Sequence, residues 1–76
     1  MTERELLGQG IRRAILGSKY TISDIARRLD TGYSTVHKWT IGSSRPNATN
    51  LRKLASILDV DQDDLWNGYP DFAVVA

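Results

Sequence analysis

The chain has 76 residues, 41% of them apolar, and a formal net charge of +1, a composition typical of one small folded domain. It contains no cysteine and a single histidine, which excludes disulfides and argues against a thiolate or histidine metal site. No apolar run approaches the roughly 18 residues that cross a membrane, and the charged N-terminus lacks the apolar core of a secretory signal, so we expect a cytoplasmic protein.

The charge is distributed unevenly along the chain. All ten basic residues lie between Arg4 and Lys53 and only four acidic residues precede position 59, so residues 1–58 carry a net charge of +6. Residues 59–76 contain five aspartates and no basic residue, so they carry −5. A cationic body suits a polyanionic partner and an anionic tail does not. Ordinary variation of surface charge explains the same pattern, so charge alone leaves the partner open.

Apolar residues recur at helical spacing through the first 67 residues and predict five short helices. The first helix ends at Gly17-Ser18, and its apolar stripe consists of Leu7, Ile11, Ala14 and Ile15. Thr21, followed at the third position by Asp24, is a capping-box pattern that predicts the start of a second helix. The inward side chains of that helix are Ile25, Ala26 and Leu29.

A short break at residues 30–32 separates the second helix from a third, which the pattern predicts over residues 34–40. Residues 41–46 have the composition of a loop. Asn47 is a residue type favoured at helix N-caps, and it predicts a fourth helix that runs to about Leu58.

Asp61 predicts the start of a short fifth helix, which Asn67-Gly68 ends. Residues 69–76 show no helical period and are either a short extended strand used in dimerisation or a linker. The sequence therefore predicts an all-α, compact, five-helix domain over residues 1–68, followed by a short C-terminal tail.

No pattern for catalysis or for cofactor binding is present in the sequence. It contains no nucleophile–base pair, no glycine-rich phosphate loop and no carboxylate cluster at metal spacing. The acidic run over residues 59–64 lacks the glycine and the terminal glutamate of a calcium loop, so we interpret it as a helix cap and solvated surface. We expect a protein that is not an enzyme and that needs no cofactor and no metal.

Residues 21–42 combine several features that two steeply crossing helices need. A small residue must stand where the helices touch, and Ala26 provides it. The short turn needs a residue that tolerates the left-handed conformation, which Asp30 does less well than glycine. The apolar residues that fix the crossing angle are Leu29, Val36 and Trp39. This arrangement leaves the outer face of the third helix free to enter a groove about 12 Å wide.

These features continue, in register and without gaps, from Leu7 to Leu65. The segments are LGQGIRRAI in the first helix, ISDIARRLD and STVHKW in the next two, Gly42 and Pro46 in the loop, and NLRKLASILDVDQDDL after it. In them the chain resembles the helix-turn-helix family of lambdoid phage repressors and Cro proteins, with their XRE-like bacterial relatives. The resemblance implies a DNA-binding transcriptional regulator that is cytoplasmic and associated with the nucleoid, with double-stranded DNA as its partner.

The resemblance also implies which residues contact DNA. The recognition helix would begin near Gly32 and read bases with four side chains on one face, namely Tyr33, Ser34, His37 and Lys38. Residues around that helix would hold phosphates, namely Lys19, Thr35, Ser43, Ser44, Arg45 and Asn47. Without the resemblance, His37 is an ordinary surface histidine and the arginines of the second helix form a solvated face.

Some positions depart from the family pattern. Ile22 stands where relatives commonly carry a glutamine that touches a phosphate and a base-reading residue, and Asp30 stands where the turn glycine is usual. Gly10 and Thr40 stand where relatives often pair an arginine with a glutamate. The loss of both partners together leaves no buried charge unpaired. The chain is then a divergent but coherent member.

One recognition helix reads only about four or five base pairs, so the resemblance implies a homodimer on a palindromic operator. The candidate dimer contacts are apolar residues near the C-terminal end, namely Leu65, Trp66, Phe72 and Val74. A transcriptional repressor of phage or bacterial origin is our main hypothesis. Two alternatives stay open: a protein-interaction module on the same fold, such as an antitoxin or antirepressor, and the N-terminal domain of a longer repressor.

Overall fold

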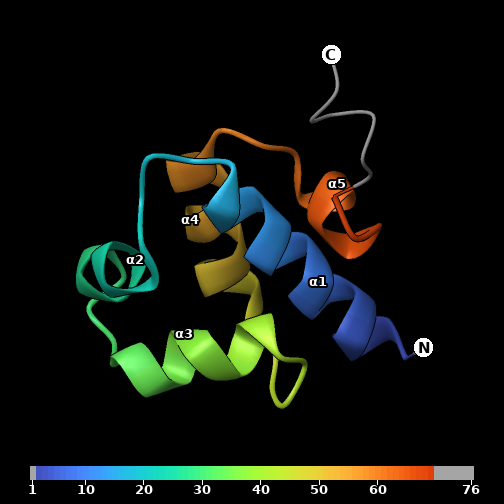
Figure 1. Cartoon of the computed structure of the whole chain (residues 1–76), viewed down its shortest axis with the longest axis horizontal. Helices are drawn as coiled ribbons and strands as arrows, with labels where there is room; N and C mark the ends of the chain where they lie inside the picture. Colours follow the sequence, from blue (N-terminus) through green and yellow to red (C-terminus); the bar gives the residue numbers. More distant parts are fainter. Residues whose placement is uncertain (1, 70–76) are drawn as a thin grey trace.

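The computed structural model describes residues 2–69, which contain five helices and no strand. They are α1 (Glu3–Leu16), α2 (Ile22–Arg28), α3 (Tyr33–Thr40), α4 (Ala48–Leu58) and α5 (Gln62–Trp66) (Figure 1). The all-α prediction is confirmed, although α3 begins one residue earlier than the pattern indicated. The predictions for Phe72 and Val74 lie outside the described residues. Within residues 2–69, none of the helices has both the length and the apolar character that a bilayer crossing requires.

Helices α1 and α2 begin with the same device, a reciprocal capping box. In α2 the amide of Asp24 donates to Thr21 Oγ1 at 3.1 Å, and the amide of Thr21 donates to Asp24 Oδ2 at 2.9 Å. Thr2 and Glu5 repeat this arrangement at the start of α1. The pKa of each carboxyl lies below its ordinary value, chiefly because the carboxylate accepts the threonine backbone amide. The predicted capping box at Thr21 is confirmed.

The starts of α4 and α5 differ from each other. Asn47 caps α4, because its Oδ1 accepts the amide of Asn50 at 2.8 Å. Asp61 occupies the N-cap position of α5 as predicted, but its side chain makes no capping hydrogen bond. Gly68, with φ of +80°, ends the turn after α5, and its amide donates to the Leu65 carbonyl at 3.1 Å. The helix boundaries therefore agree with the sequence even where the expected capping bond is missing.

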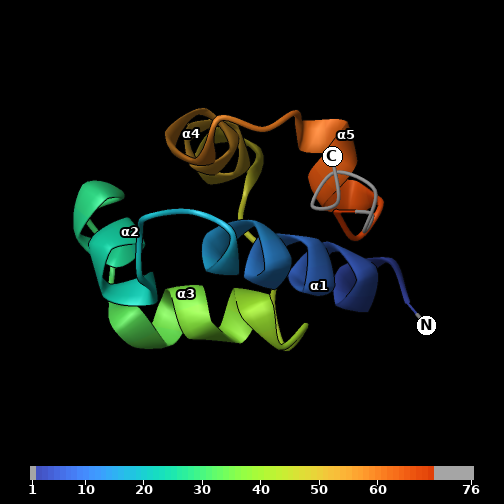
Figure 2. The ribbon, with the colours of Figure 1, turned by 45° about the horizontal axis from the view of Figure 1, so that its top comes forward.

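One apolar core joins the helices. Helix α1 lies between α3 on one side and α4 and α5 on the other (Figure 2). The largest fully buried side chains come from every helix: Leu7, Ile11, Ile25, Val36, Leu54 and Leu65. The predicted inward residues are buried, except that Leu29 is half-buried at the edge of the core. Because α3 is anchored through Val36 and Trp39, its opposite face is the one left to solvent.

Two glycines bring the backbone of α1 directly against its neighbours. A Cβ atom at Gly8 would lie 2.6 Å from the carbonyl oxygen of Trp39, and one at Gly10 would overlap the carbonyl of Leu65. Arg13 reinforces the second contact, because its Nη1 donates to the carbonyl oxygen of Gly68 at 3.2 Å. Close approach of helix backbones needs residues without a Cβ at the contact. Helix α5 is therefore docked on α1 through main-chain atoms as well as through its buried leucine.

Two expectations about this region are wrong. Gly10 and Thr40 are not partners, because Gly10 packs against the backbone of Leu65 in α5, whereas Thr40 lines a pocket with Arg12 and Ile15 of α1. Leu65 cannot lie on a dimer surface in this fold, because its side chain is 0% exposed within its own chain. Trp66 is half-buried, so part of its ring remains available at the surface.

Candidate nucleic-acid interface

A tight turn connects α2 to α3. Asp30 has the left-handed conformation expected from the sequence, with φ of 55°. The amide of Thr31 donates to the Ala26 carbonyl at 2.9 Å and that of Asp30 to the Arg27 carbonyl at 3.2 Å, so the turn folds back on the end of α2. Helix α4 ends in the same way at Asp59, with φ of 56°. Aspartate thus occupies the left-handed position after both α2 and α4, where glycine is the usual residue, and both turns still form.

Helix α3 separates a buried face from an exposed one. Its buried residues are Val36, Trp39 and Thr40. Its exposed residues include all four predicted base-reading side chains and one predicted phosphate contact: Tyr33, Ser34, His37, Lys38 and Thr35. Helical spacing places Tyr33 one turn from His37 and Ser34 one turn from Lys38 on the same face. The helix presents a polar surface to solvent, and contact of these side chains with DNA stays a prediction.

The rings of Tyr33 and His37 stack on this exposed face. Their centroids lie 6.0 Å apart and their planes differ by 11°. Parallel rings at this separation are laterally offset, which is the favourable stacked geometry for aromatic side chains. Two of the four predicted base-reading side chains therefore restrain each other before any ligand is bound.

The N-terminus of α3 is open to an external partner. Its N-cap residue Gly32 supplies no side-chain hydrogen bond, and its first turn contains no acidic residue. Among residues 2–69, the amides of Tyr33 and Ser34 have no hydrogen-bond acceptor. Open amides and the positive end of the helix dipole together favour an anion. Helix α2 differs, because its first turn contains the carboxylate of Asp24, which accepts the amide of the N-cap residue Thr21.

The loop after α3 folds back on the end of the helix. Gly42 adopts φ of +76°, and the amides of Ser43 and Ser44 both donate to the carbonyl oxygen of Lys38, at 3.0 and 3.3 Å. The side chains of Ser43 and Arg45 are exposed, whereas Ser44 is half-buried. These serine amides are therefore occupied within the protein and are not available to a phosphate.

The remaining predicted phosphate residues stand apart from each other. Asn47 uses its Oδ1 to cap α4, so only its NH₂ group is free to donate. Lys19 is exposed in the connection between α1 and α2, with its ammonium 5.6 Å from the centre of the Tyr20 ring. That connection runs to α2, away from the loop that follows α3 (Figure 1). The structure thus gathers Ser43 and Arg45 beside one end of α3 and leaves Lys19 on another side.

Sequence analysis missed an apolar groove beside α3. Leu16 is 71% exposed and Ile41 is 59% exposed, and with Ile22 they line a groove between α1, α2 and α3. The polar residues along this groove are Glu5, Gln9, Arg12, His37 and Thr40. The sequence did contain a signal, because Leu16 is apolar but lies outside the inward stripe of its helix.

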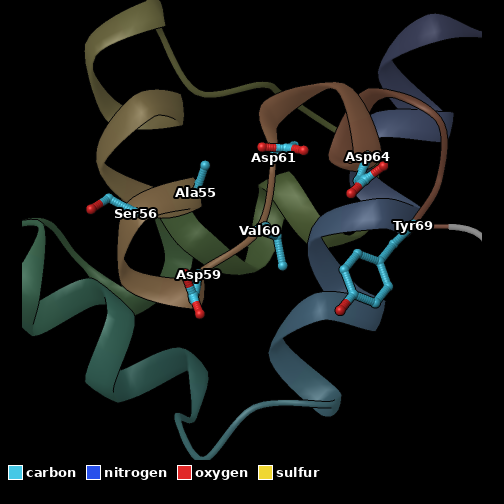
Figure 3. A pocket seen from close by; sticks show the side chains of 7 residues that line it. All are labelled: Ala55, Ser56, Asp59, Val60, Asp61, Asp64 and Tyr69. Atoms are coloured by element: carbon cyan, nitrogen blue, oxygen red, sulfur yellow. The ribbon is translucent and has the colours of Figure 1, made fainter. Parts of the chain in front are cut away.

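An acidic hollow lies at the junction of α4 and α5. It has a volume of about 380 Å³ and is lined by Ala55, Ser56, Asp59, Val60, Asp61, Asp64 and Tyr69 (Figure 3). The three aspartates stand apart around the hollow and do not converge on one point (Figure 3). Within the described part of the chain, no three acidic, histidine or cysteine side chains are grouped to hold a metal ion. The negative charge of the hollow repels phosphate, so the junction of α4 and α5 is unsuited to DNA.

The arrangement of α2, turn and α3 agrees with a known family. A family model described as helix-turn-helix matches residues 11–65, from within α1 into α5. No curated protein and no solved structure matches the chain significantly.

Proposed function

This chain belongs to the helix-turn-helix family of the Cro/C1 type, and from that membership we propose that it is a sequence-specific DNA-binding regulator that represses transcription by occupying an operator. The family is one of DNA-binding regulators and is generally not enzymatic. The uncovered face of α3 carries the proposal, because its apolar side is fixed in the core while its polar side and its open N-terminus meet solvent. A helix held in this way fits the major groove.

Base reading is assigned to the exposed face of α3. Lys38 donates to O6 and N7 of a guanine, and the hydroxyl of Ser34 bonds several kinds of base edge. Tyr33 contacts a thymine methyl group or a phosphate. His37 donates or accepts according to which ring nitrogen carries the proton. The stack of Tyr33 on His37 supports this assignment, because side chains that are already restrained lose less freedom on binding.

Phosphate binding is assigned to groups around α3. The open amides at the start of the helix suit one phosphate. Arg45 is the exposed cation of the loop after α3 and suits another, because a guanidinium matches phosphate geometry. Further phosphate contacts are assigned to Thr35, Ser43, Ser44 and Asn47 near α3 and, separately, to Lys19 in the connection between α1 and α2. Ser44 and Asn47 contribute least, since one is half-buried and the other has only its NH₂ group free.

We propose that the protein binds a palindromic operator as a homodimer, and the short length of α3 supports this proposal. A single recognition helix reads about four or five base pairs, and two such helices about 34 Å apart read successive turns of the same groove face. Within the described residues Trp66 is the candidate dimer contact, because it is apolar and only half-buried. Binding of this kind would place the protein on the nucleoid of a bacterial host or of a phage-infected cell.

Selection of bound sites from a random double-stranded DNA pool tests the proposal. We expect a palindromic consensus with half-sites about ten base pairs apart. Affinity for that consensus should exceed affinity for random DNA by about a thousandfold or more. The logarithm of affinity for random DNA should fall with the logarithm of salt concentration, with a slope of about −0.9 per phosphate contacted. Failure to enrich any consensus, together with binding that is insensitive to salt, would contradict the proposal.

The apolar groove favours a second candidate function. Leu16, Ile22 and Ile41 together expose apolar surface beside α3, and relatives commonly have a polar residue at the position of Ile22. An antitoxin or antirepressor on this fold would use such a surface to bind another protein. Under that function, affinity for random DNA would be weak and nearly independent of salt, so the salt titration distinguishes the two.

A further inference from the structure

Two pairs of cationic side chains lie near opposite ends of α3. Arg4 and Arg45 line a hollow of about 410 Å³ between the start of α1 and the loop after α3. Lys19 and Arg28 line a second hollow, of about 400 Å³, beside α2. We propose that each pair binds a phosphate, and that the two phosphates belong to the two DNA backbones that border the major groove. This inference rests on the proposed function, and it adds Arg4 and Arg28 as phosphate-binding residues.

The first hollow forms because the loop after α3 packs on the first turn of α1. A Cβ atom at Gly42 would lie 3.0 Å from the Cα of Glu5 and 3.6 Å from the carbonyl oxygen of Arg4. The lining also includes Thr2 and the carboxylate of Glu3, so two guanidinium groups against one carboxylate leave the hollow positive. The carboxylate of Glu5 accepts the amide and hydroxyl of Thr2 and is committed to the helix cap. Both arginines are exposed and therefore open to a ligand.

The second hollow is organised around the ring of Tyr20. The guanidinium carbon of Arg28 lies 4.7 Å from the centre of that ring, and the ammonium of Lys19 lies 5.6 Å from it. These cation–π contacts hold two positive charges near each other. The amide of Tyr20 donates to Ser18 Oγ at 3.0 Å, which fixes the backbone below the ring. A guanidinium that covers a ring with its face keeps the N–H groups of its edge free to donate to a phosphate.

The two arginines of α2 differ in whether they have a partner. Asp24 and Arg27 complete the lining of the second hollow. The carboxylate of Asp24 accepts Arg27 Nη2 at 2.6 Å and the amide of Thr21 at 2.9 Å, so its charge is neutralised within α2. Among residues 2–69, neither Lys19 nor Arg28 has a carboxylate partner. This pair of cations is therefore suited to an anion from outside the protein.

The two hollows lie toward opposite ends of the molecule. The start of α1 and the loop after α3 are at one end and α2 is at the other, with α3 between them (Figures 1 and 2). The longest dimension of the molecule is 31 Å, whereas the major groove is about 12 Å wide. When α3 enters the groove, both ends of the molecule therefore extend over its borders, where the phosphates stand. Phosphate contacts on both borders would fix the orientation of α3.

Phosphate ethylation interference on the selected operator tests the inference. With the unmodified protein, we expect interference at phosphates of both strands in each half-site, on opposite borders of the major groove. Arg28→Ala should weaken the interference on one border, and Arg4→Ala should weaken it on the other. Arg52→Ala is the matched control, because this exposed arginine belongs to α4, which α1 separates from α3 (Figure 2). The control should leave the whole pattern unchanged.

Salt titrations measure the same contacts in solution. Arg4→Ala and Arg28→Ala should each reduce the slope of log affinity against log salt by about one unit, and the double variant by about two. The selected consensus should stay the same, because phosphate contacts carry no base information. Arg28→Lys keeps the charge and should keep most of the slope. Thermal melts should be nearly equal for all these variants, because the side chains are exposed.

Three outcomes would overturn the inference and leave the proposed function intact. The first is an interference pattern and a salt slope that neither substitution changes, and the second is loss on the same border in both variants. The third concerns a free phosphate ligand: saturable binding of a nucleoside triphosphate to the DNA-free protein that Arg28→Ala abolishes, with unchanged salt slopes on DNA. If the unmodified protein selects no consensus at all, the proposed function itself fails.

Discussion

Helices α3 and α5 begin alike but are used differently. Neither N-cap residue, Gly32 or Asp61, makes a side-chain hydrogen bond to its helix. The first turn of α5 contains Asp63 and Asp64, whose carboxylates offset the positive end of the helix dipole, whereas the first turn of α3 contains no acidic residue. The positive end of α5 is thus balanced within the chain. That of α3 is left for an anion from outside.

The two helices also differ in which parts of them are buried. Helix α5 is held through the fully buried Leu65 and the backbone contact with Gly10. Helix α3 is held through Val36 and Trp39, and its other face is exposed. Substitutions at the α5 contact should therefore lower stability, and substitutions on the outer face of α3 should lower binding and leave stability unchanged. Helix-turn-helix proteins can keep these two requirements separate because each helix has two faces.

The largest expected effect is a loss of stability from a substitution at the contact between α1 and α5. Gly10→Ala places a Cβ against the carbonyl of Leu65, and backbone atoms must move apart to accommodate it. We expect a loss of about 3 kcal/mol in the free energy of unfolding, despite the better helix propensity of alanine. Urea denaturation measures it. The matched control is Gly17→Ala, where the nearest atom lies 3.5 Å away, and an equal loss there would show that the contact is unimportant.

The next effect concerns the exposed face of α3. Lys38→Ala should cost about 2 kcal/mol of binding free energy on the selected operator and relax the preference at one base pair. Unfolding by urea should be unchanged, since the side chain is exposed. Fluorescence anisotropy with labelled operator measures the affinity. Lys53→Ala is the matched control, because α1 separates α4 from α3 (Figure 2). Retained selectivity in Lys38→Ala would show that the reading face is placed wrongly.

Arg45→Ala should have a smaller and sequence-independent effect. The side chain lies exposed in the loop after α3 and is assigned to a phosphate. Its removal should weaken operator and random DNA alike and reduce the slope of log affinity against log salt by about one unit. Salt titrations on both DNAs provide the measurement. A loss confined to the operator would assign Arg45 to a base instead.

Replacement of the N-cap residue of α3 by aspartate gives that helix the same N-cap residue type as α5. Gly32→Asp adds a capping carboxylate at a position where a Cβ meets no atom within 4 Å. It should raise the free energy of unfolding by about 0.3 kcal/mol and weaken DNA binding by repelling phosphate. Gly32→Ser caps without charge, so it should stabilise similarly and bind DNA better than Gly32→Asp. Equal DNA binding by the two variants would show that no phosphate approaches this helix end.

The smallest expected effect concerns the cap of α2. The pKa of Asp24 is lowered, chiefly by the backbone amide of Thr21, so its carboxylate stabilises the fold above the ordinary carboxyl pKa. This stabilisation should be lost as the pH falls through the lowered folded-state pKa. Asp24→Asn should therefore melt below the unmodified protein near neutral pH, with the difference shrinking in acid. Thermal melts across the acidic range measure it, and a constant difference would contradict the linkage.

Helix boundaries were predictable because each depends on a few neighbouring residues. Thr21 and Asp24 encode the start of α2, Asn47 encodes that of α4, and Gly68 ends the turn after α5. The exposed face of α3 was predictable for a similar reason, since Val36 and Trp39 mark its buried side at helical spacing. Whether its polar side chains contact DNA stays a prediction.

Contacts between helices were less predictable. Gly10 was interpreted as the remnant of a lost ion pair with Thr40, and Leu65 as a surface residue. In the structure the two meet each other, backbone against backbone. Nothing near either residue in the sequence specifies this contact, because it requires α5 to fold back across α1.

The amino-acid order alone therefore accounts for the number and limits of the helices, the left-handed turn at Asp30 and the polar character of α3. These properties depend on hydrogen bonds and side-chain spacing within one or two turns. Packing between distant segments settled which residues are covered, including the burial of Leu65 and the exposure of Leu16 and Ile41. Burial depends on where another helix docks, and that is a property of the whole folded chain.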